Sequence, residues 1–197
     1  MSSNVEKILI IGLGMIGSSI ALSSKSKGIE VFGFDNCVDT TSIALDKKII
    51  DQSIEHFDKI VDKNFINDID LVILAVPPKQ TLDVLNQLKD IWNSEITITD
   101  TSSVKNHIKL EDVKNIVLSH PIAGSDKSGL EAADPELFLN MKNILCDPFH
   151  ANRDHFEKVE NFWKYALQMK TSLMTVSEHD LIFAMTSHLP HLVSYAL

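Results

Sequence analysis

Three glycines near the start of the chain have the spacing of a loop that receives a phosphate. Gly12, Gly14 and Gly17 directly follow the apolar run Ile8–Ile11, and a helical pattern begins within them. In such a loop the first glycine allows a tight turn and the second lets a pyrophosphate approach the backbone. The third lets the helix pack closely on the strand. The phosphates would then face free N–H groups at the positive end of the helix dipole.

An acidic residue completes this pattern. Asp35 ends the second apolar run, Val31–Phe34, at the distance from Gly12 that a dinucleotide-binding unit requires. A carboxylate at this position accepts hydrogen bonds from ribose hydroxyls and repels a 2′-phosphate. Asn36 follows, and no arginine is near in the sequence to bind a 2′-phosphate. The sequence therefore predicts NAD, and not NADP, as the cofactor.

Two further polar strings each follow a predicted strand. Ser103 lies in Asp100–Lys105 and His120 lies in Ser119–Gly124. Because the carboxyl ends of parallel strands face the cofactor crevice, we expect both side chains to lie beside the bound nucleotide. A neutral imidazole, with an ordinary pKa near ~6.5, can accept a proton from a substrate hydroxyl. Two plainer roles stay open: Ser103 as the N-cap of a helix, and His120 as a strand-end histidine satisfied by backbone.

The elements that would position these residues alternate between strand and helix. Apolar, β-branched runs predict strands, and segments at 80–92 and 154–168 have a helical period. The alternation predicts βαβ crossovers, hence an α/β, Rossmann-type, mostly parallel sheet with helices on both faces. The predicted strands are Ile8–Ile11, Val31–Phe34, Leu71–Val76, Ile96–Thr99, Ile116–Leu118, Ile144–Leu145 and Leu173–Val176.

The end of the chain has a different pattern. From Ser177 to Leu197 an apolar stripe repeats with helical spacing, and Ser177 followed by Asp180 resembles a capping arrangement. Pro190 cannot donate to the carbonyl of Thr186, so we expect a bend there.

This pattern suggests two domains. We expect residues 1–170 to form a dinucleotide-binding domain and residues 171–197 to begin an all-α domain. Because the chain ends inside a predicted helix, we expect that second domain to be incomplete in these 197 residues.

Charge and composition exclude several classes of protein. The net charge of −9 argues against a nucleic-acid-binding protein, which would need clustered Lys and Arg. Arg153 is the only arginine, so a bidentate clamp for a carboxylate is nearly absent. Cys37 and Cys146 match no metal or redox spacing, and we interpret both as reduced and structural. Neither a membrane span nor a signal peptide is evident, which predicts a cytoplasmic enzyme without membrane partners.

Taken in order, the strings resemble the prephenate/arogenate dehydrogenase family of tyrosine biosynthesis. Besides the glycine loop, the resemblance rests on Ala75–Pro77, Ser103–Lys105, His120–Gly124 with Lys127–Gly129 after it, and Ser187–His191. Members of this family oxidise a cyclohexadienol with loss of its ring carboxylate. The resemblance implies that His120 is the base for the 4-hydroxyl proton and that Ser103 orients the substrate or the imidazole.

The resemblance also enlarges the candidate site. Ser187, His188 and His191 would line the substrate pocket from the helical domain, and Asp126 would lie on its rim with Lys127. For the histidines the alternative is a satisfied position on the apolar stripe, and for Asp126 it is a solvated loop. Spacing of i, i+3 suits metal ligation, but no third ligand stands out, so we expect no metal. The further cofactor contacts implied are Met15, Ile16, Val76, Pro77 and Thr101.

In one respect the chain departs from the family pattern. The family's helical domain forms the dimer and supplies an arginine for a substrate carboxylate, and Arg153 matches no such position. Lys105 or Lys127 would have to replace that arginine. We therefore expect these 197 residues to bind NAD but to turn over prephenate poorly, and the full-length protein to be a homodimeric enzyme.

Three other functions stay open. Arogenate, which carries an amine on the side chain, is an alternative substrate that nothing in the sequence separates from prephenate. A β-hydroxyacid dehydrogenase would use a lysine in the helical domain, where Ser187–His191 offers histidines. A non-catalytic NAD-binding regulatory domain would keep the glycine loop and Asp35 but would not need His120.

Overall fold

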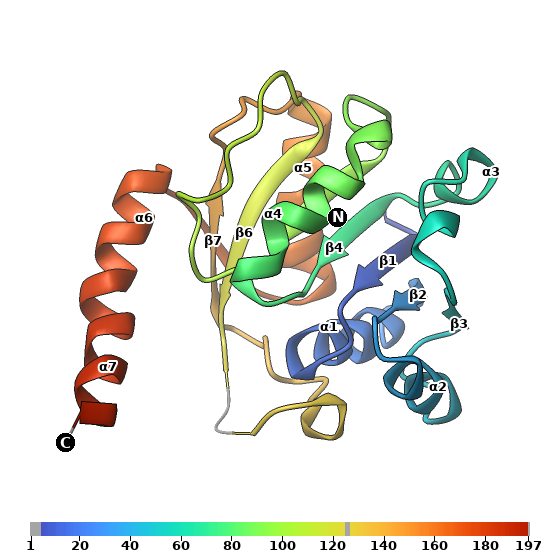
Figure 1. Ribbon diagram of the computed structural model, residues 1–197, viewed down its shortest axis with the longest axis horizontal. Helices are drawn as coiled ribbons and strands as arrows, with labels where there is room; N and C mark the ends of the chain where they lie inside the picture. Colours follow the sequence, from blue (N-terminus) through green and yellow to red (C-terminus); the bar gives the residue numbers. More distant parts are fainter. Residues whose placement is uncertain (1–4, 125–126, 197) are drawn as a thin grey trace.

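The protein is described by a computed structural model that covers residues 5–124 and 127–196. Eight strands form one sheet, with helices on both of its faces (Figure 1). The strands are β1 (Lys7–Ile11), β2 (Glu30–Phe34), β3 (Gln52–Ser53), β4 (Leu71–Leu74), β5 (Thr97–Asp100), β6 (Ile116–Ile122), β7 (Lys142–Cys146) and β8 (Lys170–Leu173). The helices are α1 (Met15–Lys25), α2 (Val38–Asp46), α3 (Lys63–Ile66), α4 (Pro78–Gln87), α5 (Arg153–Asn161), α6 (Val176–Phe183) and α7 (Leu189–Ala196). Short 3₁₀ turns lie at Phe57–Lys59, Lys89–Ile91 and Leu130–Ala132, and π-helical turns at Phe162–Ala166 and Ala184–His188.

The sheet has the strand order β3-β2-β1-β4-β5-β6-β7-β8. Every neighbouring pair is parallel except β6 and β7, which are antiparallel. The first six strands follow the order typical of dinucleotide-binding folds, in which a crevice opens where the order reverses beside β1. The predicted α/β fold with a mostly parallel, doubly covered sheet is confirmed.

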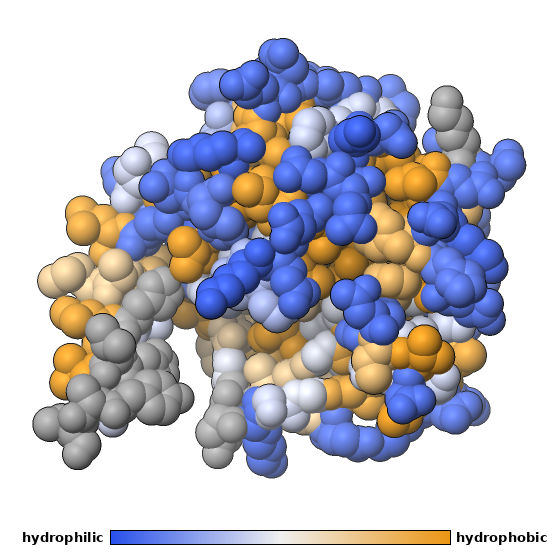
Figure 2. Space-filling model, viewed as in Figure 1, coloured by the Kyte–Doolittle hydropathy of each residue, from blue (hydrophilic) through white to orange (hydrophobic). Residues whose placement is uncertain are grey.

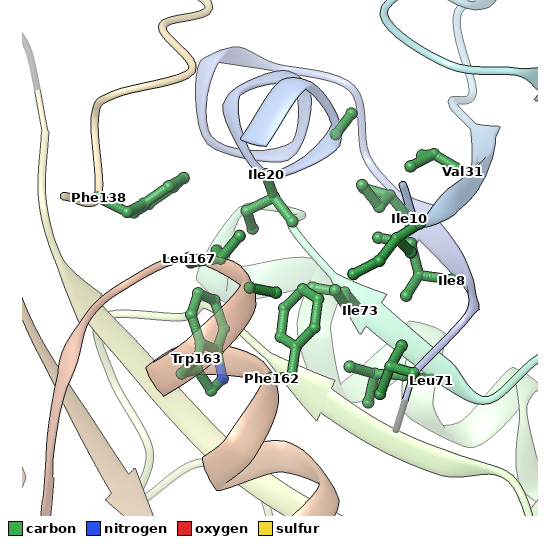
Figure 3. Close-up of a cluster of buried hydrophobic side chains, with 14 of the residues drawn as sticks. Ile8, Ile10, Ile20, Val31, Leu71, Ile73, Phe138, Phe162, Trp163 and Leu167 are labelled. Carbon is green, nitrogen blue, oxygen red and sulfur yellow. The ribbon is translucent and has the colours of Figure 1, made fainter. Parts of the chain in front are cut away.

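Each central strand buries side chains on both faces, which is why its sequence is apolar throughout. In β1, Ile8 and Ile10 belong to one buried cluster and Leu9 and Ile11 to the other. Figure 3 shows the first cluster, in which Ile20 of α1 and the aromatic rings of the π-helical turn after α5 pack on the sheet. The second cluster contains residues of α4 and is bordered by residues of α6. The central strands are therefore packed on both faces, which fixes where the loops at their carboxyl ends begin.

Strand β6 is longer than the sequence predicts. It runs to Ile122, whereas the apolar run predicts an end at Leu118. Beyond Val117 it pairs with β7 and no longer with β5. Pro121 has no N–H to donate, and this one-sided pairing accommodates it. His120 consequently lies within a strand and not in the loop after one, which corrects the expectation.

The helix near the end of the chain begins with a different cap from the one predicted. Thr175, not Ser177, is the N-cap, and it forms a reciprocal capping box with Glu178. A π-helical turn, Ala184–His188, lies directly before Pro190, where the missing N–H led us to expect an irregularity. Asp180 is thereby released from the predicted capping role.

The two last helices carry an apolar row that the rest of the described chain does not cover. Leu181, Met185, Leu189 and Val193 are 67%, 61%, 46% and 49% exposed. In Figure 1, α6 and α7 stand beside the sheet, and Figure 2 shows apolar residues along this edge. Strand β8 extends the sheet to Leu173, slightly past the expected boundary at residue 170. Among the described residues, no helix has the length and apolar character needed to cross a membrane.

Candidate active site

A cleft of about 700 Å³ opens at the carboxyl edge of the sheet. The loops after β1, β2, β4 and β5 line it together with residues of β6. Ten of the residues predicted for the site lie in its wall, and the structure therefore brings the two predicted halves of the site together. These residues are Gly12, Gly14, Met15, Ile16, Asp35, Val76, Pro77, Thr101, Ser103 and His120.

The three glycines of the loop are required for three different reasons. Gly12 has φ +98°, and a Cβ there would lie 2.6 Å from the carbonyl oxygen of Ala75. A Cβ on Gly17 would lie 1.9 Å from the carbonyl oxygen of Gly12, so this glycine sits under the loop and lets α1 approach it. A Cβ on Gly14 would meet no atom within 4 Å. Gly14 thus leaves open the space through which a ligand reaches the backbone.

The N-terminus of α1 faces the same space. Gly14 is the N-cap, and no side chain caps the helix there. The first N–H groups of a helix have no partner within it, and the helix dipole adds positive potential. Met15 and Ile16 line the cleft at this point. The arrangement suits a bound phosphate.

Asp35 has a structural role that the sequence pattern does not reveal. Its half-buried carboxylate accepts hydrogen bonds from the N–H of Leu13 at 2.8 Å and the N–H of Cys37 at 2.9 Å. The side chain therefore ties β2 to the glycine loop. A carboxylate offers about four acceptor sites, so capacity remains for ribose hydroxyls.

The two cysteines differ in their surroundings. Both are free thiols, as expected. Cys146 is buried in β7, and burial raises the pKa of its thiol to about 11. Cys37 is exposed in the wall of the cleft, and hydrogen bonds with Thr40 lower its pKa. Our interpretation of Cys37 as a structural residue is therefore wrong, because it lies at the exposed start of α2.

Ser103 lies in a loop after β5 and does not begin a helix, which excludes the N-cap role. The neighbouring Ser102 makes the local turn, since its hydroxyl donates to the carbonyl of Val104 at 3.0 Å. Thr101 donates its N–H to the carbonyl of Leu74 at 2.9 Å and so ties the end of β5 to β4. Ser103 itself is half-buried in the wall of the cleft that also contains His120.

Lys105 is not available to bind a substrate carboxylate. Its side chain is fully buried, and Nζ donates to both carboxylate oxygens of Asp100, at 2.7 and 2.6 Å. It also donates to the carbonyl of Ser119, the residue before His120. Burial lowers the pKa of Lys105, and the charge of Asp100 opposes that shift. The lysine is thus an internal support beneath His120, because a buried charge needs a close partner.

His120 is part of a chain of hydrogen bonds that the sequence did not suggest. Its Nδ1 lies 2.8 Å from Nε2 of His179, and Nδ1 of His179 lies 2.7 Å from Oδ1 of Asp180. The ring of Phe183 packs against both imidazoles, with centroids 4.7 Å apart in each case. His179 and Asp180 are adjacent in the sequence but far from His120, so spacing alone gave no signal for the contact.

The predicted substrate-binding residues near the end of the chain are placed only in part. Ser187 is half-buried in the π-helical turn and does not line the cleft. The side chains of His188 and His191, and all of Asp126, lie outside the described residues. Lys127 does line the cleft.

Two further site expectations concern Arg153 and metal binding. Arg153 is 87% exposed and pairs with Glu157. Among the residues described, no group of three potential metal ligands is found.

Comparison with known proteins places the chain in a family. A family model described as "Prephenate dehydrogenase, nucleotide-binding domain" matches residues 20–170. The chain is 34% identical to prephenate dehydrogenase of Lactococcus lactis, over 98% of this chain and 53% of that protein. It is 32% identical to cyclohexadienyl dehydrogenase of Zymomonas mobilis, over 98% of this chain and 66% of that one. The chain thus spans between half and two thirds of the length of these relatives.

The fold agrees with this assignment. The solved structure of prephenate dehydrogenase from A. aeolicus, in complex with hydroxyphenyl propionate and NAD⁺, superimposes with a TM-score of 0.86 at 30% identity. The match covers 98% of this chain and 68% of that one. With its glycine loop, doubly wound sheet and nucleotide-binding segment, the chain belongs to the prephenate dehydrogenase family.

Proposed function

We propose that this protein binds NAD in the cleft and acts in the oxidative decarboxylation of prephenate to 4-hydroxyphenylpyruvate. The observation that carries the proposal is the set of residues that line the cleft. The glycine loop and Asp35 line it together with Ser103 and His120. The names of its relatives support the same reaction. We further propose a cytoplasmic enzyme of tyrosine biosynthesis that forms a homodimer.

The residues of the cleft fit NAD. The open backbone at Gly14 and the uncapped start of α1 would receive the pyrophosphate, and Asp35 would bind the ribose hydroxyls. Val76, Pro77 and the other predicted contacts would border the remainder of the cofactor. A 2′-phosphate would meet the negative charge of Asp35, which favours NAD over NADP.

His120 would act as the general base and later the general acid of the reaction. When bound, NAD supplies the acceptor for the hydride that leaves carbon 4 of the substrate. His120 accepts the proton of the 4-hydroxyl, and the ring carboxylate then leaves as CO₂ with its bonding electrons entering the ring. The same imidazole returns the proton to the phenolate oxygen. One hydride is transferred and one CO₂ is lost, with no net change in protons.

The substrate would be held from both sides of the cleft. Ser103 would orient the substrate or the imidazole of His120 from the loop after β5. His188 and His191 would approach from a helical domain that begins near residue 171, in which Ser187 lies outside the wall of the cleft, and Asp126 would lie on the rim. This division, with residues 1–170 as the dinucleotide-binding domain, is part of the proposal.

Arogenate is the second candidate substrate. The similarity to cyclohexadienyl dehydrogenase of Zymomonas mobilis favours this alternative. Arogenate carries an amine in place of the side-chain ketone of prephenate, so the ring chemistry at His120 would be the same. Rates measured with both substrates in the full-length gene product would decide between them.

The test is the rate of NADH formation from prephenate by the full-length gene product and its His120→Asn variant. We expect the variant to lose about 10²- to 10⁴-fold in kcat, the usual contribution of a general base. Its Kd for NAD should stay within about twofold, because the loss lies in proton transfer and not in nucleotide binding. Undiminished turnover in the variant would refute the role of His120 as the base. NAD binding without any turnover in the wild-type protein would instead favour a non-catalytic NAD-binding regulatory domain.

A further inference from the structure

We propose that His179 and Asp180 are positioning residues that set the tautomer of His120, so that Nε2 is its proton-accepting nitrogen. The inference rests on the proposed role of His120 as the base. It concerns two residues of α6 that do not line the cleft. They would act on the reaction only through the imidazole of His120.

The direction of the hydrogen bonds follows from Asp180. An ionised carboxylate only accepts hydrogen bonds, so Nδ1 of His179 must carry the hydrogen in the 2.7 Å contact with Oδ1 of Asp180. In a neutral imidazole the other nitrogen is then an acceptor. Nε2 of His179 therefore accepts from Nδ1 of His120 across 2.8 Å. With its hydrogen on Nδ1, His120 keeps the acceptor electron pair on Nε2.

Asp180 is held in the ionised form and in place. Its carboxylate accepts the backbone N–H of Lys105 at 3.0 Å and the backbone N–H of Asn106 at 2.8 Å. Burial would raise the pKa of Asp180, but its hydrogen bonds with His179 and these two N–H groups outweigh burial and lower it. The capping box at Thr175 fixes the start of α6 just before these residues. The ionised, fixed carboxylate therefore determines the direction of the hydrogen bonds from His179 and His120.

His179 is held in the neutral form that the tautomer argument needs. Its ring is fully buried, and burial lowers its pKa even though the hydrogen bond to Asp180 favours the charged ring. The charged or titratable groups that face it are His120 of β6, Asp180 of α6, and the buried pair of Lys105 with Asp100. That pair is internally neutralised, so Asp180 is the one uncompensated anion among these groups.

Replacing Asp180 with Asn should reverse the chain of hydrogen bonds. The side-chain carbonyl of Asn can still accept the backbone N–H groups, while its NH₂ must donate to Nδ1 of His179. The hydrogen of His179 then moves to Nε2 and donates to Nδ1 of His120, which places the hydrogen of His120 on Nε2. The substitution changes the tautomer with almost no change in shape, as in the Ser-His-Asp arrangement of hydrolases.

The first experiment measures the tautomer directly in the 197-residue chain, by ¹⁵N NMR of the histidine side chains. Wild-type His120 should carry its hydrogen on Nδ1, and Asp180→Asn should move it to Nε2. The matched control is His155→Asn, which removes a buried histidine bonded to the hydroxyl of Thr97 at 2.7 Å, away from the cleft. This control should leave the His120 signals unchanged. A hydrogen on Nε2 of wild-type His120, or no change in Asp180→Asn, would overturn the proposal.

The second experiment measures the consequence in the full-length gene product. Asp180→Asn should lower kcat about 10²- to 10⁴-fold, with KM for prephenate and Kd for NAD within about twofold. The single variant His179→Gln, whose side-chain carbonyl can still accept a hydrogen bond from Nδ1 of His120, should retain most of the wild-type kcat. If Asp180→Asn does not fold, His179→Phe keeps the ring volume, removes the acceptor, and should lower kcat likewise. Normal kcat in folded Asp180→Asn or His179→Phe would refute the positioning role.

The two proposals fail in different ways. Should His120→Asn keep normal turnover while Asp180→Asn still moves the hydrogen of His120, the proposed base is wrong and the tautomer assignment stands. Should His120→Asn lose turnover while the tautomer and kcat of Asp180→Asn stay normal, the base stands and the positioning role is refuted.

Discussion

The two ends of the cleft are built in different ways. The glycine-loop end comes mainly from one continuous segment, β1 through the end of β2, packed against the carbonyl of Ala75, and its geometry depends largely on backbone atoms. The histidine end joins β6 to α6, and its geometry depends on side chains whose positions differ by 59 residues in the sequence. The first end can therefore be predicted from local sequence spacing. The contacts of the second end form only when segments far apart in the sequence come together in the fold.

The two ends also differ in what holds them. A short approach between backbone atoms supports the glycine loop, so a single added carbon is enough to disrupt it. A fully buried ion pair, Lys105 with Asp100, supports the histidine end from beneath. Steric contacts therefore determine the glycine-loop end, and electrostatic interactions determine the histidine end. Substitutions at the glycine-loop end should therefore destabilise the protein through steric clashes, and substitutions at the histidine end should do so through an unpaired buried charge.

The largest effect should come from Gly17→Ala. The new Cβ would lie 1.9 Å from the carbonyl oxygen of Gly12, and neither backbone can move without separating α1 from β1. We expect a loss of more than about 4 kcal/mol in the free energy of unfolding, together with loss of NAD binding. Urea denaturation measures it. A variant as stable as the wild type would show that the glycine-loop end is not sterically determined.

Lys105→Met should have the next largest effect. It leaves the carboxylate of Asp100 buried without its partner, which costs about 3–5 kcal/mol of stability. As a control, Lys47→Met removes a pair with Glu131 whose side chains are 47% and 71% exposed, and should cost less than about 1 kcal/mol. Equal losses in the two variants, measured by urea denaturation, would contradict the electrostatic support of the histidine end.

Gly14→Ala separates binding from folding at the glycine-loop end. Its Cβ would meet no protein atom within 4 Å, so stability should change by less than about 1 kcal/mol. The same Cβ would occupy the space through which the pyrophosphate approaches, and we expect at least about tenfold weaker NAD binding. Titration calorimetry measures the affinity. Unchanged affinity would place the phosphates elsewhere.

Acid should act mainly on the buried histidines, with a smaller effect than these substitutions. Burial lowers the pKa of His179 and of His155 below the ordinary value of 6.5. Below about that pH the unfolded chain binds more protons than the folded chain, so the free energy of unfolding falls as the pH falls. Asp180, with its lowered pKa, adds a further loss as the pH falls toward and below 3.8. Denaturation at pH 7.5 and pH 5.5 should show lower stability at the lower pH, and His155→Asn should reduce the difference. Equal stability would contradict the buried, neutral histidines.

What the sequence predicts follows the same division. The alternation of strands and helices, the glycine loop and Asp35 are predictable because each depends on residues that are close together in the sequence. The Asp35 contact with Leu13 and the burial of Lys105 are not, since both arise when separate strands come together. The capping box shows the same limit on a small scale. Ser177 and Thr175 are both acceptable caps, and the Glu178 side chain decides for Thr175.

The central claim, that the cleft binds NAD, is tested most directly by titrating the 197-residue chain with NADH and with NADPH while following nicotinamide fluorescence. We predict saturable binding of NADH at one site, at least about tenfold tighter than NADPH, because Asp35 opposes a 2′-phosphate. Absence of saturable binding, or equal affinity for the two nucleotides, would contradict the assignment.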